Sequence, residues 1–534
     1  MKTALLSVYN KEEIVDFAKE LVGMGWKILA SGGTAKALAD ADVPVRDVAE
    51  IVGGGEILGH RVVTLSREVH AGLLATSSKS DKQELKRFGI PRIDLVCADL
   101  YPLQEEINNP DSTTESVIEK TDIGGPALLR SAAKGRRIVI CDPRDRCAVL
   151  DWLKIGRPDE KEFLNKLAAK AEAVVAKYCL ISARHNSRGF YDGAVGAEAM
   201  SCKYGENAWQ TPASLVSVGS EDPLAIDKFI SVAGSEPSYN NLADLDRMLQ
   251  TLTHIAAVFE LNRSYVPFIA VAVKHGNACG AAVASSPIEA IKKMITGDTR
   301  AIFGGAVIVN FEIGDVLAGL ISKYNMQNGE RRLLDIVAAQ SFSPGALEVL
   351  GRKGGKCRLI ENPSLNLVDC KKLDLQTRFR LVRGGLLKQP NYTFVLNLSD
   401  PQIEKIGRMA RAGEKEDALL AWAIGSTSNS NTVTLVKNRM LIGNGVGQQD
   451  RVGACELAIK RAQDAGHDTD GAVAYSDSFF PFIDGPETLA KSGIRTILAS
   501  SGSVRDKEVK EFCKGNDIAL FLVPDAIARG FFGH

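Results

Sequence analysis

The alternation of strand-like and helix-like segments over the first 150 residues most constrains the fold. "TALLSV" (3–8) has the continuous apolar character of a buried strand, and "KEEIVDFAKELVGMG" (11–25) has the apolar spacing of an amphipathic helix that ends on glycine. "WKILA" (26–30) is the next strand, and later strands follow at 93–103 and 136–143. Strands that alternate with helices at this spacing predict a parallel α/β sheet with helices on its faces.

The chain is long enough for more than one domain. At 534 residues it exceeds the size at which a single hydrophobic core usually forms. A helical run over 160–183 closes the first region, and a new series of strand-to-loop transitions begins near residue 200. We therefore expect an N-terminal domain over 1–199 and a C-terminal region over 200–534. The Gly- and Pro-bearing stretch near 341–360 is expected to divide that region into two halves.

Composition argues against several classes of protein. Lys plus Arg and Asp plus Glu both number 65, so no net field draws the chain to nucleic acid or to an anionic membrane. The ten cysteines are scattered without a C-x-x-C motif, as is typical of reduced thiols in the cytoplasm. The sequence shows neither a signal peptide nor an apolar stretch long enough to span a bilayer. We expect a cytoplasmic, globular protein with no nucleic-acid or membrane partner.

Two common kinds of catalytic machinery lack their motifs. No histidine begins an H-x-E and no P-C-x-x-C is present, so the zinc ligands of a deaminase are missing. No G-x-S-x-G nucleophile elbow occurs either. We expect chemistry without a catalytic metal.

A Gly-rich loop between a strand and a helix predicts a phosphate site. In "ILASGGTAKAL" the glycines let backbone approach a ligand, and the helix N-terminus offers free N–H groups. Neighbouring hydroxyls and cations fall at the same edge of the sheet, where ligands of open α/β sheets bind. The candidate residues are Ser7, Lys11, Ser31, Gly32, Gly33, Thr34, Arg61 and Thr64. The alternative is a tight strand-to-helix turn that binds nothing.

A second motif in this region has the residue types of an acid/base set. "TDIGGPALLRSAAKG" places Asp122 before the turn glycines Gly124 and Gly125, and Lys134 follows at the end of the same helical run. Tyr101 in "DLYPL" adds a phenol. These groups suit proton transfer around a bound anion. The basic residues of this run are also typical of a solvated helix face.

In the second region, "VAVKHGNACG" places Lys274 and His275 together at the end of an apolar strand. One interpretation is an edge position where both side chains reach water. The other is a general base with a neighbouring cation, set where a strand opens into a Gly-rich loop.

Three further clusters in the second region have weaker signals. "SYNNLADLD" contains Asn240 in an adjacent pair of amides that suits a ligand or a turn. "GNGVGQQDR" contains Gly445 in a glycine-rich stretch that a β-hairpin also explains. "SDSFFPFIDG" contains Phe479 and Asp484, and its rings suit a flat heterocycle or a core corner.

These segments, in this order, resemble one family along almost the whole chain. The matching segments of the first region are LLSVYNK, ASGGTAKAL, GHRVVTL, EVHAGLL, DLYPL and DIGGPALLRSAAK. Those of the second are KYGEN, SYNNLADLD, VKHGNACG, GVGQQDR, SDSFFPF, SGSVRD and FFGH. The pattern is similar to that of the bifunctional purine-biosynthesis enzymes that join AICAR formyltransferase to IMP cyclohydrolase. Each motif alone is weak, whereas a dozen in order are highly specific.

The resemblance implies a fold, a donor and an assembly. It implies an N-terminal methylglyoxal-synthase-like, doubly wound sheet that performs cyclisation. It also implies a formyltransferase region of two cytidine-deaminase-like α/β halves that lack the deaminase zinc. The substrates are nucleotides and the co-substrate 10-formyltetrahydrofolate. Members of the family are intertwined homodimers with transferase sites at the subunit interface.

The resemblance also implies roles for individual residues. The acceptor amine is conjugated to an imidazole ring and attacks poorly, so a base is required, and His275 matches that position. Lys274 would stabilise the formyl oxygen or assist the departing folate nitrogen, and Asn431 would hold the substrate or the base. Lys203, Tyr204, Phe479, Asp484 and His534 match positions around nucleotide and folate. The Gly-rich loop would hold the 5′-phosphate, and Tyr101, Asp122 and Lys134 would move protons during ring closure.

Some positions depart from the family pattern. Val63 stands where a lysine linked to cyclisation is usual, and Asp99 replaces an asparagine. Lys203, Ala208, Trp209, Ala278, Ser426 and Arg529 differ from the usual residues in the second region. One alternative is therefore a formyltransferase with weak or lost cyclohydrolase activity. Another is a nucleotide-binding regulatory homologue without chemistry, against which the retained Lys274–His275 pair and Asn431 argue.

Overall fold

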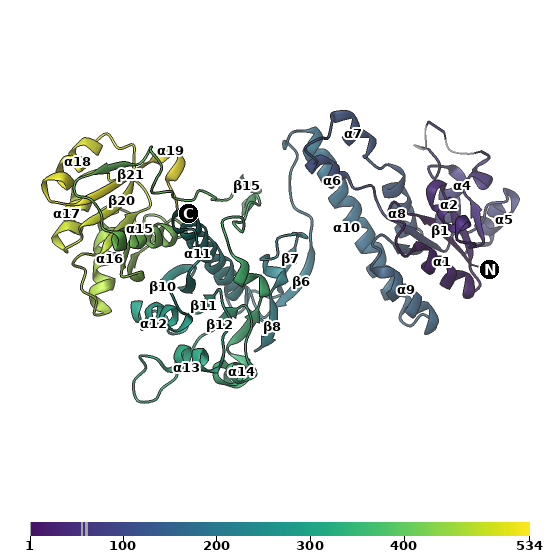
Figure 1. The fold of residues 1–534 in the computed structure, drawn as a ribbon. Helices are drawn as coiled ribbons and strands as arrows, with labels where there is room; N and C mark the ends of the chain where they lie inside the picture. Colours follow the sequence, from purple (N-terminus) through teal and green to yellow (C-terminus); the bar gives the residue numbers. More distant parts are fainter. Residues whose placement is uncertain (1, 55–56, 59–61, 534) are drawn as a thin grey trace. The chain divides into compact units, whose positions relative to one another are not determined.

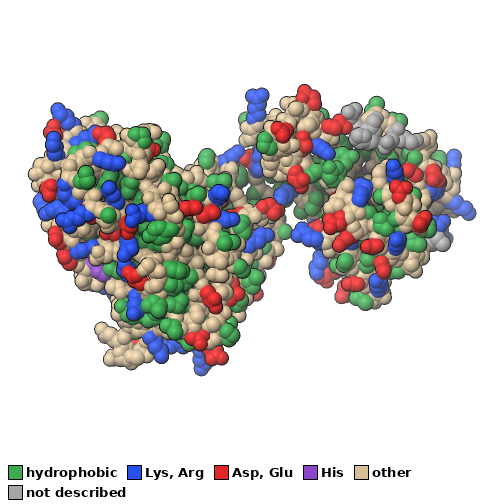
Figure 2. Space-filling view, viewed as in Figure 1, with side chains coloured by type: hydrophobic (Ala, Val, Ile, Leu, Met, Phe, Trp, Pro, Cys, Tyr) green, Lys and Arg blue, Asp and Glu red, His purple; other side chains and the backbone are tan. Residues whose placement is uncertain are grey.

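The computed structural model describes residues 2–54, 57–58 and 62–533. The chain divides into two compact units, residues 1–196 and 197–534 (Figure 1). Positive and negative side chains are interspersed over the visible surface of each unit (Figure 2).

The N-terminal unit is built on a five-stranded sheet in the order β3-β2-β1-β4-β5. All its neighbouring strands run parallel, which confirms the α/β prediction. The strands are β1 (Thr3–Ser7), β2 (Lys27–Ala30), β3 (Val45–Asp47), β4 (Leu95–Ala98) and β5 (Ile138–Ile140). The strand order reverses between β1 and β4, so the carboxyl ends of these two strands frame the crevice where such sheets bind ligands.

Helices connect these strands and cover the sheet. They are α1 (Ile14–Gly23), α2 (Gly32–Asp40), α3 (Ala49–Val52), α4 (Arg67–Leu74), α5 (Lys79–Arg87), α6 (Leu103–Asn108), α7 (Thr114–Glu119), α8 (Gly124–Lys134), α9 (Asp145–Lys154) and α10 (Glu160–Asn186). The core consists of the continuous apolar strands and the inner faces of the helices, as the sequence pattern predicts.

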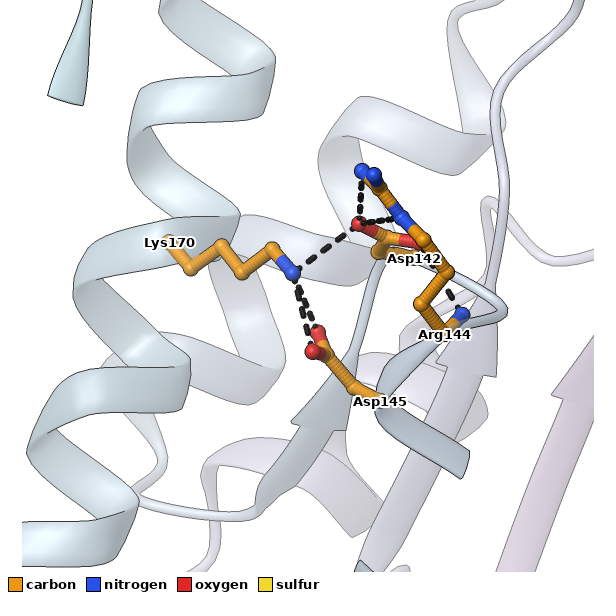
Figure 3. Close-up of polar contacts among 4 residues, drawn as sticks. All are labelled: Asp142, Arg144, Asp145 and Lys170. Carbon is orange, nitrogen blue, oxygen red and sulfur yellow. Dashed lines mark hydrogen bonds and ion pairs between the residues drawn. The ribbon is translucent and has the colours of Figure 1, made fainter. Parts of the chain in front are cut away.

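A polar cluster fixes the long helix α10 to the loop that follows β5 (Figure 3). The ammonium of Lys170 lies 3.0 Å from Asp142 Oδ2 and 2.7 Å from Asp145 Oδ2. Arg144 approaches the same Asp142 carboxylate at 2.7 Å. The hydrogen bond from Arg144, together with those from Lys170, holds the pKa of Asp142 well below its usual range.

The C-terminal unit is built on a twelve-stranded mixed sheet with internal symmetry. Its strands follow the order β16-β21-β20-β19-β17-β18-β10-β9-β11-β12-β13-β8. The antiparallel pair β10 and β18 joins the two halves through Ala282 and Met440. On either side of this seam the sequence of antiparallel and parallel pairings is the same. The unit therefore consists of two α/β halves of one topology.

The strands of the first half are β8 (Ile230–Ala233), β9 (Phe268–Lys274), β10 (Asn277–Ala284), β11 (Ala306–Val309), β12 (Ile336–Ala339) and β13 (Arg358–Glu361). Those of the second half are β16 (Glu404–Ile406), β17 (Val433–Lys437), β18 (Met440–Gly445), β19 (Val473–Ser476), β20 (Thr496–Ser501) and β21 (Ala519–Pro524). Two separate hairpins pair β6 (Ala197–Cys202) with β7 (Ala213–Ser217) and β14 (Arg378–Val382) with β15 (Gly385–Gln389).

The helices of this unit are α11 (Tyr239–Arg263), α12 (Pro287–Gly297), α13 (Asp315–Lys323), α14 (Pro344–Leu350), α15 (Ala412–Gly425), α16 (Arg451–Asp464), α17 (Asp484–Lys491), α18 (Asp506–Gly515) and α19 (Asp525–Ala528). The largest core cluster contains buried side chains of α11 and α15. Among the described residues, none of the helices combines the length and apolar character that crossing a bilayer requires.

The division between the halves falls later in the chain than 341–360. That stretch contains α14 and most of β13, and β13 pairs in parallel with β12 inside the first half. Pro344 and Gly345 begin α14, Gly351 ends it, and Gly354 and Gly355 lie in the 3-10 turn that follows. The crossover to the second half lies between β13 and β16, where the β14–β15 hairpin intervenes.

Two candidate active sites

The predicted phosphate loop forms at the carboxyl ends of β1 and β2. The hydroxyls of Ser7 and Ser31 lie 2.9 Å apart, and Gly32 begins α2 with a φ of 46° that favours glycine. A Cβ at Gly33 would lie 3.8 Å from Cε of Lys11, so the lysine side chain lies against the loop. Burial lowers the pKa of Lys11. The structure thus brings Ser7, Lys11 and the Ser31–Gly33 turn together.

Thr34 has a different role from the one its position in the motif suggests. Its hydroxyl accepts a hydrogen bond from Val8 N and donates one to Val8 O, both at 3.1 Å. The side chain is 2% exposed. Thr34 therefore fastens α2 to the end of β1, and its hydroxyl is already engaged.

A turn before α8 brings the second group of candidates together. Asp122 Oδ1 accepts a hydrogen bond from Gly125 N at 2.9 Å. A Cβ at Gly125 would lie 2.5 Å from Asp122 Oδ2, and one at Gly124 would lie 3.1 Å from Thr64 Oγ1. Burial raises the pKa of Asp122. The turn thus places the Asp122 carboxyl near Thr64, and the close approach of that carboxyl favours glycine at position 125.

Asp99 joins these two groups, although the sequence alone did not single it out as a site residue. Its carboxylate accepts hydrogen bonds from Tyr9 N and, at 3.2 Å, from Asn10 N. The ring of Tyr101 lies edge-on to that of Tyr9 with centroids 5.5 Å apart. The loops after β1 and β4 are therefore held against each other at the point where the strand order reverses.

Lys134 does not join this group within one chain. It is the last residue of α8, whereas Gly124 beside Asp122 is the first. A helix rises 1.5 Å per residue, so Lys134 lies roughly 15 Å along the axis from the Asp122 turn. Its side chain is exposed. Lys134 and Asp122 belong to one sequence motif, but a straight helix keeps their side chains apart.

In the described part of the segment between β3 and α4, no cation takes the place of the lysine that Val63 replaces. Val63 packs against the apolar core of the N-terminal unit. Arg67 pairs with Glu68 at 2.8 Å and lies 5.4 Å from the ring of Phe88. Its charge is therefore directed to another part of the surface. Arg61 lies outside the described residues.

In the C-terminal unit, Lys274 ends β9 and His275 begins the turn into β10. His275 and Gly276 have φ values of 52° and 73°, so a tight left-handed turn projects the imidazole from the end of a buried strand. The side chain of His275 is exposed. Lys274 Nζ donates to the carbonyl of Phe303 at 2.9 Å. The imidazole of His275 is therefore exposed, as a general base that meets a substrate must be, and the apolar strand β9 fixes its position.

One face of α11 connects this turn to the other nucleotide candidates. Asp244 Oδ1 accepts from Gly276 N at 2.8 Å, and Arg247 Nε donates to Gly276 O at 2.9 Å. One turn earlier, Asn240 Nδ2 donates to the carbonyl of Glu206 at 3.1 Å. The neighbouring segment is fixed there by backbone bonds from Lys203 N to Pro237 O and from Tyr239 N to Tyr204 O, both at 3.0 Å. Lys203, Tyr204 and Asn240 are thus held at the same end of α11 as His275.

The second asparagine of the SYNN motif is structural. Asn241 and Ser238 form a reciprocal capping box at the start of α11, with bonds of 3.0 and 3.3 Å. Sequence reasoning missed Asp244 and Arg247. Their spacing from Asn240, which places all three on one helical face, was the signal that could have identified them.

Asn431 lies in a loop that contacts the His275 turn. Asn429 N, two residues earlier, donates to Asn277 Oδ1 at 3.0 Å. Asn431 Nδ2 donates to Gln448 O at 2.9 Å, and its Oδ1 accepts from Arg451 Nη2 at 2.8 Å. An amide carries two N–H donors, and only one of them bonds to a described residue, so the other is available to a ligand.

The remaining candidates are Phe479, Asp484, Gly445 and His534. Phe479 lies 5.5 Å from the guanidinium of Arg529, near the chain's C-terminal end, and Asp484 begins α17 with Oδ1 on Gly485 N at 2.8 Å. A Cβ at Gly445 would lie 2.1 Å from Ala454 O, so this glycine serves the close packing of β18 on α16. His534 lies outside the described residues. No group of three or more His, Cys, Asp or Glu within the described ranges is arranged to hold a metal ion.

Comparison with known families identifies two matching regions of the chain. Residues 132–461 match the AICARFT/IMPCHase bienzyme family, and residues 13–127 match the MGS-like domain family. The MGS-like match includes β2, β3 and β4 and ends at the start of α8, just past the Asp122 turn, whereas the bienzyme match begins near the end of α8 and includes the last part of the N-terminal unit.

Individual relatives resemble the chain over different lengths. "Bifunctional purine biosynthesis protein PurH" of Anoxybacillus flavithermus is 35% identical over 535 residues, which cover 98% of this chain and 98% of the relative. A solved structure titled "Crystal structure of ForH" is 36% identical, covers 36% of this chain and 100% of its own, and has a TM-score of 0.33. On the family match and the full-length relative, the chain belongs to the AICARFT/IMPCHase bienzyme family.

Proposed function

We propose that the two units divide the two activities of the family, with one candidate site in each. The chain is a bifunctional enzyme of purine biosynthesis, an AICAR formyltransferase and an IMP cyclohydrolase. Its transferase reaction uses a folate-type one-carbon donor, for which we propose 10-formyltetrahydrofolate. The observation that carries the assignment of sites is the exposed imidazole of His275, which a buried strand and α11 hold in place.

In formyl transfer, we assign His275 as the general base. The acceptor amine is a weak nucleophile because its lone pair is delocalised into the imidazole ring and carboxamide. His275 takes the amine proton as the nitrogen attacks the formyl carbon. The bond from that carbon to the folate nitrogen then breaks, and the departing nitrogen receives a proton. Lys274, at the end of the same strand, stabilises negative charge on the formyl oxygen.

In cyclisation, we assign the Ser7, Lys11 and Ser31–Gly33 cluster to the 5′-phosphate. The carboxamide nitrogen attacks the formyl carbon, a C–N bond forms, and water leaves. Asp122, whose pKa burial raises, gives a proton to the leaving oxygen, and Tyr101 lies on the adjoining loop. We assign Lys134 no step within the same chain because of its place at the far end of α8.

We also propose a homodimer, supported by the β14–β15 hairpin. Within the described residues this two-stranded element pairs with no other strand, and it exposes Leu381 (83%), Leu387 (59%) and Leu386 (45%). Leu381 and Leu386 are cross-strand partners on one face of the hairpin, and Leu387 lies on the other face. Isolated hairpins are marginal in water, so a partner that covers these leucines would stabilise this one. Light scattering should give twice the chain mass of 57.4 kDa. A monomer at micromolar concentration would contradict this proposal.

His275→Ala tests the assignment of the transferase site. Loss of a positioned general base should lower formyl transfer by about 10²- to 10⁴-fold. Cyclisation of supplied FAICAR, the formylated AICAR that the transferase makes, should stay near the wild-type rate, because this step belongs to the other unit. Folate product and IMP are measured separately on one preparation. Near-normal formyl transfer by this variant would overturn the role of His275.

A further inference from the structure

The guanidinium of Arg247 holds three segments that are far apart in the sequence. Nε donates to Gly276 O at 2.9 Å, in the turn that presents His275. Nη2 donates to Asn429 Oδ1 at 3.0 Å, in the loop that leads to Asn431. Nη1 donates to the carbonyl of Phe532, close to the C-terminal end. A planar fork with donors in fixed directions suits three acceptors at once, and a lysine cannot replace it.

The C-terminal tail is held from several sides at this point. The ring of Phe532 is 7% exposed and lies between two guanidinium groups, 4.3 Å from that of Arg247 and 4.0 Å from that of Arg378. Phe532 N donates to Ser428 O at 2.9 Å, and Asn429 Nδ2 donates to Gly533 O at 3.2 Å. Figure 1 shows the C-terminal end beside α11. The tail is therefore packed on the same residues that hold the His275 turn.

The His275 turn has its backbone fixed on both sides by α11. Gly276 donates its N–H to Asp244 and accepts from Arg247 through its carbonyl, so neither group is free to rotate. Asn277, next along the chain, accepts from Asn429 N. If the tail leaves, Phe532 no longer covers the guanidinium, and the fork loses one of its three acceptors.

We propose that Arg247 is a positioning residue for formyl transfer, coupling the docked C-terminal tail to the orientation of the His275 turn. The proposal rests on the assignment of His275 to formyl transfer. Arg247 acts through the backbone of Gly276 and through Asn429, without a step of its own in the chemistry. A tail that is docked aligns the base, and a tail that is displaced leaves it misaligned.

The test compares Arg247→Met, Phe532→Ala and the double variant in the full chain. Displacement of a catalytic group by about 1 Å costs on the order of 100-fold in rate. We expect kcat for formyl transfer from 10-formyltetrahydrofolate to AICAR to fall by about that factor in Arg247→Met, with a change in KM below about threefold. Arg247→Lys should recover less than about tenfold, because it keeps the charge and loses the fork.

Coupling predicts that the losses do not multiply. Because both substitutions break the same arrangement, the double variant should lose no more than about threefold beyond the worse single variant. Cyclisation of FAICAR on the same preparation should be unchanged. If Arg247→Met does not fold, Phe532→Ala carries the test alone: kcat for formyl transfer should fall while cyclisation of FAICAR stays unchanged, and a normal kcat would overturn the proposal.

Arg332→Met is the matched control. Arg332 is 4% exposed, and burial lowers its pKa to about 10, as for Arg247. Its guanidinium bonds to the carbonyls of Ile321 and Tyr324, at the C-terminal end of α13, and not to the His275 turn or the loop of Asn429. The control should lose stability while keeping kcat. A purely structural role for Arg247 predicts the same behaviour for Arg247→Met.

The outcomes separate this inference from the function on which it rests. If His275→Ala has lost formyl transfer while Arg247→Met keeps a normal kcat, the role of Arg247 is wrong and that of His275 stands. Multiplying losses in the double variant, or parallel loss of cyclisation, also overturn it. Full formyl transfer by His275→Ala would instead remove the proposed function beneath it.

Discussion

One added methyl group at Gly125 tests whether Asp122 acts in cyclisation. A Cβ there would lie 2.5 Å from Asp122 Oδ2 and 2.6 Å from Leu100 Cδ2, whereas ordinary contact begins near 3.4 Å. The Asp122 carboxylate must therefore retreat by roughly 1 Å, a displacement that costs on the order of 100-fold in rate when the group acts in the reaction. Overpacking of this kind also lowers the free energy of unfolding by about 1–3 kcal/mol.

The assay follows IMP formation from FAICAR at saturating substrate by wild type and Gly125→Ala. Formyl transfer from AICAR, measured on the same protein, reports on the C-terminal unit and should be unchanged. Gly23→Ala is the matched glycine control, because a Cβ at that position of α1 meets nothing within 4 Å. If Gly125→Ala cyclises FAICAR at a rate close to wild type, then Asp122 has no part in the step, and our account of this site is wrong.

Two further predictions concern the N-terminal unit. Val63→Lys should raise the rate of IMP formation, because Val63 is apolar and the Arg67 side chain is paired with Glu68. If the wild type is already fast and the variant is no faster, the site works without this lysine. Lys170→Met should weaken the dependence of stability on acid pH. The contacts from Arg144 and Lys170 lower the folded-state pKa of Asp142, so they stabilise the fold above the unfolded carboxyl pKa of about 4, and this stabilisation is lost as the pH falls. Urea unfolding between about pH 6 and pH 3 measures that slope, and an unaltered slope in the variant would show that Lys170 contributes nothing to it.

Local patterns in the sequence were sufficient for the class of fold and for naming many residues of each candidate site. Continuous apolar runs that alternate with helical spacing predicted the parallel sheet of the N-terminal unit, because burial on both faces demands such strands. Ser7, Ser31 and His275 were identifiable because each ends a strand or follows directly on one, and strand ends are where such sheets expose side chains. The order of the motifs identified the family before any geometry was known.

Tertiary structure alone decided which of these residues meet. Lys134 shares a motif with Asp122 but lies at the opposite end of α8. Arg247 bonds to both Gly276 and Phe532, which most of the sequence of the C-terminal unit separates. Gly445 and Gly125 look alike in sequence, yet one admits the backbone of α16 and the other accommodates a carboxylate. Residue type and spacing specify the local backbone conformation and the chemistry that a side chain can offer. The neighbours that side chain receives depend on how distant segments pack, and no local pattern contains that information.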